Sequence, residues 1–338
     1  MGPSPRPVMA DVAARAGVSV MTVSRVLNGF PGVADGTRRR VERAVTALGY
    51  HANTAARVLA GGRSRTLGVI AVETEQFGPS HILFGIEAAA RAAGHLLSFV
   101  TVSRTGKEIA STLEHLRASH VEGIIVVAPV TPVIDAVSRI EKNLALVVVG
   151  GDPRRSTATV TIDQVEGARL ATGHLLDLGH RTVHHVRGPR SWVDAAARAQ
   201  GWTDALRSSS SPRTPPVLGD WSAGGGYAAG VRLAKDPDVT AVFAANDQTA
   251  LGIMRALHEA GRRVPEDISV VGFDDTPESC YFLPALSTIR QDFGEVGRRS
   301  VELVLSLMDD ETSARHVVVP AQLVIRESAA LPPAHNTR

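Results

Sequence analysis

Cysteine is nearly absent from the 338-residue sequence, which contains only Cys280. A single cysteine excludes an internal disulfide and cannot form a cysteine-rich metal site by itself. No histidine lies near Cys280 in the sequence, so we expect a buried or half-buried structural thiol rather than a reactive nucleophile.

Long apolar runs are also missing. No stretch of 18 or more apolar residues occurs, so we expect no membrane-spanning helix. The start of the sequence lacks the basic and then apolar layout of a secretory signal. We therefore expect a cytoplasmic protein without a membrane partner. The apolar fraction of 44% is sufficient for full-sized cores in two or three domains.

Acidic residues are scarce in the first part of the chain. Residues 1–65 contain ten arginines and three acids, a formal charge of +7, whereas the remaining residues sum to −5. A basic segment attached to a mildly acidic body is typical of a nucleic-acid-binding module joined to another domain.

Residues 9–28 predict two short helices that meet at Gly17. Gly17 suits the left-handed residue that ends a helix, Val18 is expected to pack inward, and Ser19 is placed to cap the second helix. The inward positions recur at three- and four-residue spacing in both helices, at Val12, Ala13, Ala16, Val23, Val26 and Leu27. The outward side of the second helix carries Val20, Met21, Thr22, Ser24 and Arg25.

Two short helices joined by so tight a turn form a helix-turn-helix, whose second helix fits the DNA major groove. The same spacing also fits any αα-hairpin of a small bundle. The positive charge of this segment favours contact with DNA phosphates.

A third helix is predicted over about 36–48, with Asp35 as its cap and Gly49 at its end. Residues 54–60 predict a further helix capped by Asn53, too short to persist alone in water. One interpretation is a flexible linker. The other is a hinge helix that orders on DNA and offers Leu59 as an apolar wedge in the minor groove.

From Thr66 onward, short apolar runs alternate with amphipathic helices. Strands are predicted in 67–72, 95–102, 123–129, 144–151, 157–163, 182–188, 241–246, 268–274, 286–290, 316–320 and 322–328. Helices are predicted at about 80–93, 109–121, 133–142, 165–178, 194–207, 223–235, 247–260 and 293–308. This alternation predicts two α/β lobes with doubly wound parallel sheets.

Two similar lobes with strands crossing between them leave a cleft, and ligands bind beyond the carboxyl ends of the strands. Asn246 and Asp274 each end a predicted strand, so both are expected to face this cleft. An amide and a carboxylate suit sugar hydroxyls. Asn246 also fits a helix cap, and Asp274 with Asp275 also fits a polar turn.

No catalytic constellation is present in the sequence. The glycines at 224–226 do not form the dinucleotide-binding GxGxxG pattern. No Ser/His/Asp or metal-ligand spacing occurs, and the adjacent His184 and His185 face opposite sides of a predicted strand. We therefore expect no enzymatic activity, no metal site and no cofactor.

Several segments resemble the LacI family of bacterial transcriptional repressors, in order and at matching spacing. These are DVAARAGVSVMTVSRVLN, NTAARVLAG, QGW at 200–202, GDWSAGGG, ANDQTALGIMRAL, DISVVGFDD and LSTIRQDF. The resemblance covers nearly the whole chain. It implies an all-α helix-turn-helix headpiece followed by a two-lobed, periplasmic-binding-protein-like (type I) effector domain.

The resemblance implies a DNA headpiece at 1–52, a hinge helix and linker at 53–65 and an effector-binding and dimerisation domain at 66–338. The first lobe would span about 66–162 and 293–321, and the second about 163–290 and 322–332. A homodimer is expected, with interface elements at 80–93 and 280–283. The leucine-rich helix that joins two dimers in the family does not follow residue 338, so we expect no larger assembly.

DNA-reading positions carried over from the family centre on the second helix. Arg25 can donate a bidentate pair to guanine. Val20 and Met21 replace a polar pair found in the family and offer only van der Waals contact. Leu59 occupies the intercalating position, which implies operator DNA with a central CpG step. The full set is Ser19, Val20, Met21, Thr22, Ser24, Arg25, Asn28, Asn53, Ala56 and Leu59.

Effector-binding positions carried over by resemblance are Arg198, Trp221, Asn246, Asp274, Gln291, Phe293, Pro79 and Ile82. Trp221 and Phe293 would flank the apolar face of a sugar ring. Gly150 and Val127 depart from an acid and an amide in the family, so the first lobe should offer fewer polar contacts.

These features predict a repressor that a small sugar in the cleft releases from a palindromic operator, controlling carbohydrate use, for example of a galactoside or another disaccharide. Two alternatives stay open. One is a regulator that requires a sugar or purine co-repressor. The other is a solute-binding protein of a transporter, which should carry a signal sequence or a lipidated cysteine near its start.

Overall fold

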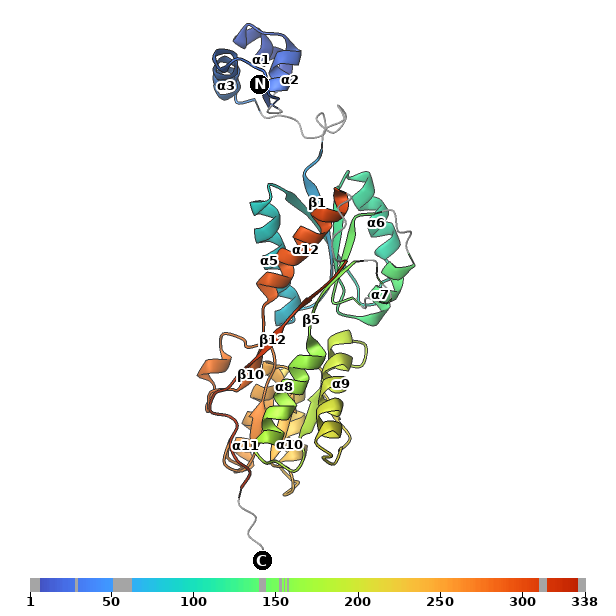
Figure 1. Ribbon diagram of the computed structural model, residues 1–338, viewed down its shortest axis with the longest axis vertical. Coiled ribbons are helices and arrows are strands. Elements are labelled where there is room, and N and C mark those ends of the chain that lie inside the picture. Colours follow the sequence, from blue (N-terminus) through green and yellow to red (C-terminus); the bar gives the residue numbers. More distant parts are fainter. Residues whose placement is uncertain are drawn as a thin grey trace, which may run out of the picture. The chain divides into compact units, whose positions relative to one another are not determined.

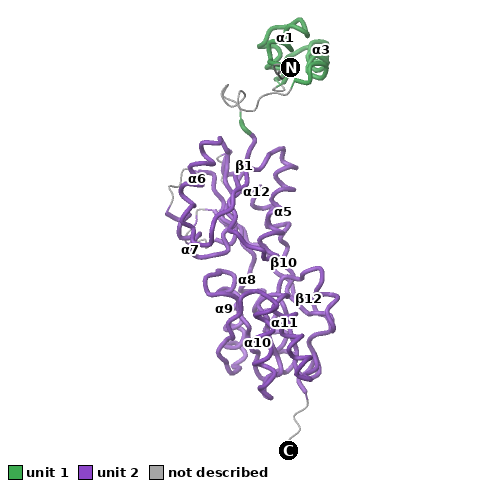
Figure 2. Tube along the Cα trace, turned by 180° about the vertical axis from the view of Figure 1, so that it is seen from behind, with its two compact units in different colours: residues 1–64 green, residues 65–338 purple. Residues whose placement is uncertain are grey.

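The computed structural model describes residues 7–27, 30–50, 63–139, 144–151, 154, 156, 158–309 and 315–333. Two compact units make up the chain, Met1–Ser64 and Arg65–Arg338 (Figure 2). The predicted hinge helix at 54–60 lies outside the described residues. Among the described residues, no helix is both long and apolar enough to cross a membrane.

The described residues of the first unit form three helices: α1 (Met9–Ala16), α2 (Val20–Leu27) and α3 (Asp35–Leu48). Gly17 has the left-handed conformation, with φ +63°, and the Ser19 hydroxyl accepts a hydrogen bond from the Thr22 amide at 3.1 Å. The predicted turn and cap are therefore confirmed. The core consists of Val12, Ala13, Ala16, Val23, Val26, Val41, Ala44 and Tyr50.

One prediction for α3 was wrong. Asp35 is the first residue of the helix, and Ala34 occupies the cap position. The Asp35 carboxylate in the first turn still interacts favourably with the positive end of the helix dipole. Gly49 ends the helix with φ +58°, as predicted.

The first lobe of the larger unit is built on a six-stranded parallel sheet of order β11-β5-β4-β3-β1-β2 (Figure 1). The strands are β1 (Thr66–Val72), β2 (Leu96–Val102), β3 (Gly123–Val127), β4 (Leu146–Val149), β5 (Thr159–Ile162) and β11 (His316–Val319). The helices are α5 (Phe77–Ala92), α6 (Ile109–Ala118), α7 (Thr131–Ser138) and α12 (Phe293–Met308).

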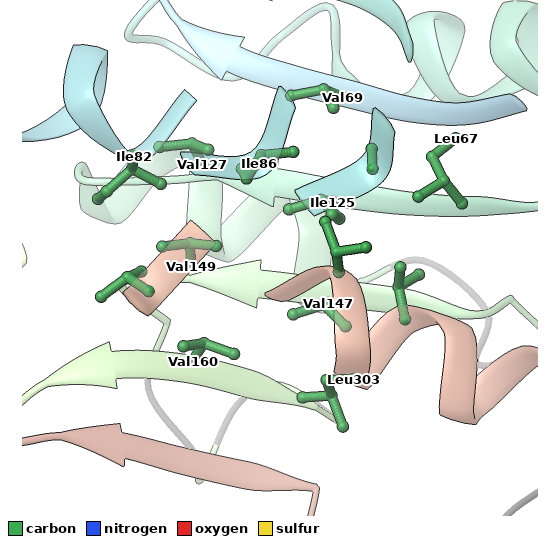
Figure 3. Close-up of a cluster of buried hydrophobic side chains, with 14 of the residues drawn as sticks. Leu67, Val69, Ile82, Ile86, Ile125, Val127, Val147, Val149, Val160 and Leu303 are labelled. Atoms are coloured by element: carbon green, nitrogen blue, oxygen red, sulfur yellow. The ribbon is translucent and has the colours of Figure 1, made fainter. Parts of the chain in front are cut away.

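Both faces of this sheet are buried. Alternate side chains of β1 enter different cores: Leu67 and Val69 pack with α5 and α12, whereas Ile70 and Val72 pack with α6 and α7. Figure 3 shows the first of these cores. Burial on both faces explains why the strands form continuous apolar runs in the sequence.

The second lobe has a four-stranded parallel sheet of order β7-β6-β8-β9. Its strands are β6 (His184–Arg187), β7 (Val217–Leu218), β8 (Ala241–Ala244) and β9 (Ser269–Val271), and sequence periodicity missed the two-residue β7. The helices α8 (Gln164–Asp177) and α9 (Val193–Ser208) cover one face, while α10 (Ala223–Leu233) and α11 (Asp247–Glu259) cover the other.

Two strands outside these parallel sheets, β10 (Thr288–Gln291) and β12 (Ala321–Val324), form an antiparallel ribbon. The chain passes between the lobes three times, from β5 to α8, from β10 to α12 and from β11 to β12. The lobes therefore share a set of connecting segments beside the space between them.

Two local expectations were wrong. Cys280 is exposed rather than buried, because it lies in a surface 3-10 turn at Ser279–Tyr281. The helix predicted from residue 80 begins at Phe77, with Pro79 in its first turn. Proline is tolerated there because amide groups of the first turn have no partner within the helix.

Candidate functional site

A cavity with an empty volume of about 650 Å³ lies between the two lobes. Its wall contains all eight residues that the sequence predicted for effector binding, from seven helices, strands and turns far apart in the chain: Pro79, Ile82, Arg198, Trp221, Asn246, Asp274, Gln291 and Phe293. The structure thus brings the predicted set together around one space.

Four polar side chains of the second lobe form a closed ring in the cavity wall. The Arg198 Nε donates to Gln164 Oε1 at 2.8 Å, and Gln164 Nε2 donates to Gln291 Oε1 at 2.7 Å. Gln291 Nε2 donates to Asp274 Oδ1 at 2.6 Å, and the Arg198 Nη2 lies 3.4 Å from the same oxygen. This network fixes the direction of each group before a ligand arrives, which reduces the entropy lost on binding.

Arg198 is the centre of this ring. Its guanidinium also donates to the Ala245 carbonyl and lies over the Phe273 ring, 3.8 Å from the centroid. The side chain is 4% exposed, so the charge is held in a fixed position by planar contacts that suit arginine. Arg198 is therefore a buried residue of the site and not a surface arginine.

Asp274 is held by its backbone in an unusual conformation. Its φ is +111°, and its amide donates to the Ile289 carbonyl of β10 at 2.8 Å. Such strain persists where the surrounding structure enforces it and is common at functional sites. Burial raises the pKa of Asp274 to about 6, and the nearby Arg198 partly opposes this effect.

The neighbouring acids Asp274 and Asp275 have different surroundings. Burial alone would raise the pKa of Asp275, but its ion pairs with Arg326 and Arg290, both at 2.6 Å, hold that pKa below its ordinary value. Asp275 is not part of the cavity wall. Of the two, only Asp274 is available to a ligand there.

Asn246 combines the two interpretations that the sequence left open. Its Oδ1 accepts from the Thr249 amide at 3.0 Å and so caps α11. Its Nδ2 donates to the Trp221 carbonyl at 3.0 Å. Because the residue also lines the cavity, the cap orients the amide beside the aromatic wall.

Trp221 requires special local geometry. Its φ is +73°, and its ring lies so close to Gly188 that a Cβ atom there would be 2.3 Å from Trp221 Cζ2. The indole is 5% exposed, and its Nε1 has no hydrogen-bond partner among the described residues.

The first lobe contributes mainly apolar surface to the cavity. Pro79, Ile82 and Phe293 lie there together with Gly150 and Val127, the two departures noted in the sequence. Gly78 allows the Phe293 ring to approach, since a Cβ at this glycine would be 3.0 Å from Phe293 Cε1. An aromatic and aliphatic wall facing a polar ring suits the two faces of a sugar.

The residues of the cavity wall that sequence reasoning missed include Gln164, Trp192 and Asp194. Asp194 lies four residues before Arg198 in α9, a spacing that places both on one face of a helix and could have revealed it. Gln164 gave no such signal, since its role depends on Gln291, 127 residues away.

Trp192 belongs to a contact between the lobes that we call the latch, residues 129–131 and 191–193. The Thr131 amide donates to the Ser191 carbonyl at 2.9 Å, and the Val193 amide donates to the Pro129 carbonyl at 3.1 Å. The Trp192 ring meets Trp221 edge to face at a centroid distance of 5.6 Å. The latch closes one side of the cavity.

In the smaller unit, the predicted base-reading side chains lie on the outer side of α2. Val20 is 47% and Met21 66% exposed, and Arg25 is exposed. Ser19 and Thr22 form a cap at the start of the helix, with their hydroxyl oxygens 2.9 Å apart. Asn28, Asn53, Ala56 and Leu59 lie outside the described residues.

A two-lobed ligand-binding unit joined to a separate helix-turn-helix unit defines the class of ligand-responsive DNA-binding regulators. Comparison with known proteins agrees. The profile of the "Bacterial regulatory proteins, lacI family" matches residues 8–53, and that of a "Periplasmic binding protein-like domain" matches residues 172–329.

The chain is 36% identical to the lactose operon repressor of Escherichia coli (strain K12), over 95% of this chain and 90% of that protein. It is 34% identical to the HTH-type transcriptional regulator CelR of Thermobifida fusca, over 96% and 98%. The chain belongs to the lacI family of bacterial regulatory proteins.

Solved structures give the same result. A lac repressor dimer bound to operator and the anti-inducer ONPF matches with a TM-score of 0.90 and 34% identity, over 96% of this chain and 100% of that chain. A complex of the regulator CelR with cellobiose matches with a TM-score of 0.70 and 32% identity, over 96% and 100%. The predicted fold class and family are confirmed.

Proposed function

We propose that the protein is a transcriptional repressor that binds a palindromic operator as a homodimer and is released by a saccharide in the interlobe cavity. The observation that carries the proposal is the cavity itself, where a fixed polar ring faces an aromatic and aliphatic wall. Family membership supports the DNA-binding part. A repressor acts on chromosomal DNA, so the cytoplasm is its expected location.

We assign residues 1–52 to the DNA-binding headpiece, 53–65 to the hinge and linker, and 66–338 to the effector and dimerisation domain. Within the headpiece, Arg25 reads guanine through a bidentate pair, a contact that contributes about 1–3 kcal/mol of base discrimination. Ser19, Thr22 and Ser24 lie near phosphates, and Asn28 belongs to the same DNA-binding set. The apolar Val20 and Met21 contact thymine methyl groups, so the operator differs there from those read by polar side chains.

In the hinge, Asn53, Ala56 and Leu59 contact the minor groove, with Leu59 inserted at a central CpG step and the DNA bent. Two hinge segments, one from each protomer, would stabilise each other on the operator. Binding to the operator therefore requires a dimer. Large apolar side chains exposed on α5 and the 280–283 segment support such an interface: Phe84 at 69%, Tyr281 at 83% and Leu283 at 94%.

The effector site consists of Arg198, Trp221, Asn246, Asp274, Gln291, Phe293, Pro79 and Ile82. Asp274 accepts hydrogen bonds from sugar hydroxyls, Gln291 accepts from them or donates to them, and Trp221 with Phe293 packs against the C–H face of the ring. No catalytic role is assigned to any of these residues, because the family acts by reversible binding.

Release requires that saccharide and operator stabilise different arrangements of the two lobes. Binding in the cavity adds contacts to both lobes and changes their relative orientation. The hinge segments attached to the first lobe then lose their mutual packing. The headpieces consequently bind DNA as two weakly coupled units instead of one.

The experiment is selection of DNA sequences by the full chain from a random library, followed by mobility-shift titration with lactose, cellobiose and other saccharides. We expect an inverted repeat with a central CpG step and release by at least one saccharide. Arg25→Ala should relax the preference for one base pair per half-site. Failure of every saccharide to change operator affinity would reject the effector class.

A further inference from the structure

We propose that the cavity binds hydroxyl-rich saccharides that carry no negative charge and rejects anionic sugars such as uronates, and that Asp194 carries this selection. The inference rests on the proposed saccharide-responsive function and specifies the ligand class of the same site. Asp194 was not among the effector positions that the sequence indicated.

Asp194 lies in the first turn of α9 and lines the cavity. The four-residue spacing to Arg198 places both side chains on one face of the helix. The positive end of the helix dipole favours an ionised carboxylate at this position.

Unlike the other charged groups of the wall, Asp194 makes no hydrogen bond or ion pair within the described part of the chain. Arg198 is held by Gln164, Asp274 and the Ala245 carbonyl, whereas Asp274 is held by Gln291 and Arg198. Burial raises the pKa of Asp194, while Arg198 partly offsets this effect. Its oxygens are therefore acceptors without donors.

The charges of the cavity wall are unbalanced. Among the described residues that line it, Asp194 and Asp274 are acidic and Arg198 alone is a guanidinium or ammonium group. Asp194 also raises the pKa of Asp274, so the two carboxylates already repel each other. A further negative charge on a ligand would add to this repulsion in a largely desolvated space.

The Trp221 indole is the second polar group of the wall that has no hydrogen-bond partner among the described residues. Its Nε1–H is buried and has no acceptor among the described residues. A ligand for this cavity should therefore donate to Asp194 and also present an acceptor to Trp221.

The three classes of ligand differ in how they meet both demands. A hydroxyl group is both a donor and an acceptor. An amino sugar donates to Asp194 through its ammonium group and keeps hydroxyl groups that can accept from Trp221. A carboxylate or phosphate accepts from Trp221 but is repelled by Asp194 and Asp274. The wall therefore suits hydroxyl-rich ligands that carry no negative charge.

The test is calorimetric titration of the full chain at pH 7.5 with two matched series: galactose, galactosamine and galacturonate, and glucose, glucosamine and glucuronate. Lactose and cellobiose serve as neutral disaccharide probes. We expect each uronate to bind about 100-fold more weakly than its neutral counterpart, as expected for one added like charge at short range, and the amino sugars to show no such penalty.

Two variants identify the group responsible. Asp194→Asn retains an acceptor oxygen without the charge, so binding of neutral sugars should weaken less than about 10-fold, while the penalty against uronates should largely disappear. Asp194→Ser removes the charge and shortens the side chain, so both the acceptor for neutral sugars and the penalty against uronates should be lost. The matched control is Asp204→Asn, an acid of the same helix that is held by Gln200 and Arg207 and is not in the cavity wall.

The outcomes are distinct. Wild-type binding of a uronate as tight as that of its neutral counterpart would overturn the proposal, as would an unchanged preference in Asp194→Asn. If sugars release the operator but Asp194→Asn alters nothing, this inference fails alone. If no sugar binds or releases the operator, the proposed effector function fails and this inference with it.

Discussion

At the scale of single residues, the site depends on close approach as much as on polar chemistry. Gly188 is the clearest example, because its missing side chain provides the space for the Trp221 ring. The ring in turn packs against Trp192 and lies 5.3 Å from the Arg198 guanidinium. Because Gly188 has a hydrogen atom where alanine has a methyl group, the Trp221 ring can take its place in the cavity wall.

Gly188→Ala is expected to displace the Trp221 ring and lower saccharide affinity at least about 10-fold, while operator affinity without saccharide stays unchanged. Titration calorimetry and mobility shift measure the two effects. The control is Gly173→Ala in α8, where a Cβ meets nothing within 4 Å. That change should stabilise the larger unit by about 0.5–1 kcal/mol and leave binding intact. Wild-type saccharide affinity in Gly188→Ala would contradict this account of the wall.

The Asp274 carboxyl predicts a pH dependence. Its pKa is raised from 3.8 to about 6, so the folded protein binds this proton more tightly than the unfolded chain. The contribution of Asp274 to stability is therefore greatest below about pH 4 and decreases as the pH rises towards 6. Saccharide binding behaves oppositely, because the ionised form is the stronger acceptor of hydroxyl groups.

We expect saccharide affinity to fall as the pH is lowered from 7 to 5. Titration calorimetry across this range, with the same series on Asp274→Asn, measures the effect. The variant should bind more weakly and lose most of the dependence. A parallel slope in wild type and variant would assign the titration to another group.

At the scale of helices and strands, local sequence signals and distant contacts contribute differently in the two units. In the headpiece, Gly17 ends α1 and Ser19 caps the start of α2, as local sequence rules predict. In the larger unit, the latch depends on residues 129–131 meeting 191–193, which no local pattern indicates.

Ser19→Ala removes the acceptor that caps α2 and should destabilise the headpiece by about 1 kcal/mol. Hydrogen exchange at the α1 and α2 amides of the full chain measures this change. Thr46→Ala in α3 is a matched control, because the Thr46 hydroxyl only donates back to the Glu42 carbonyl and its loss should cost nothing. Equal protection in wild type and Ser19→Ala would show that the cap does not limit opening.

Trp192→Ala should open the latch. The indole is 4% exposed, and its removal leaves a space between the lobes beside Trp221. Faster amide exchange at Thr131 and Val193 and weaker saccharide binding are expected. Leu218→Ala, at a residue that is 58% exposed, controls for loss of an apolar side chain of the same lobe. Unchanged exchange at both amides would contradict a role for Trp192 in the latch.

At the scale of the whole molecule, the proposed function is a coupling between two compact units, each with its own hydrophobic core. Such coupling is reciprocal for binding free energies. If saturating saccharide lowers operator affinity by a certain factor, then operator must lower saccharide affinity by the same factor. Mobility shift with saccharide and calorimetry with operator measure the two factors. Factors that disagree beyond error would show that a two-state description is insufficient.

The sequence by itself determined the order of nearly all elements, the turn at Gly17, the separate basic unit and the eight residues of the effector wall. Periodicity and capping are local properties, and the motifs carried the resemblance to the family. Boundaries were less accurate, as Asp35 and Phe77 show, because burial decides whether a marginal first turn is retained.

Only the tertiary structure decided which polar groups face the cavity and which already have hydrogen-bond or ion-pair partners in the protein. Asp274 and Asp275 are adjacent in sequence, yet Arg290 and Arg326 neutralise one and leave the other to the cavity. Asp194 and the Trp221 indole became significant because the chain offers them no partner within the described residues. Partners distant in the chain meet only after folding, so no local pattern can record whether a polar group has one.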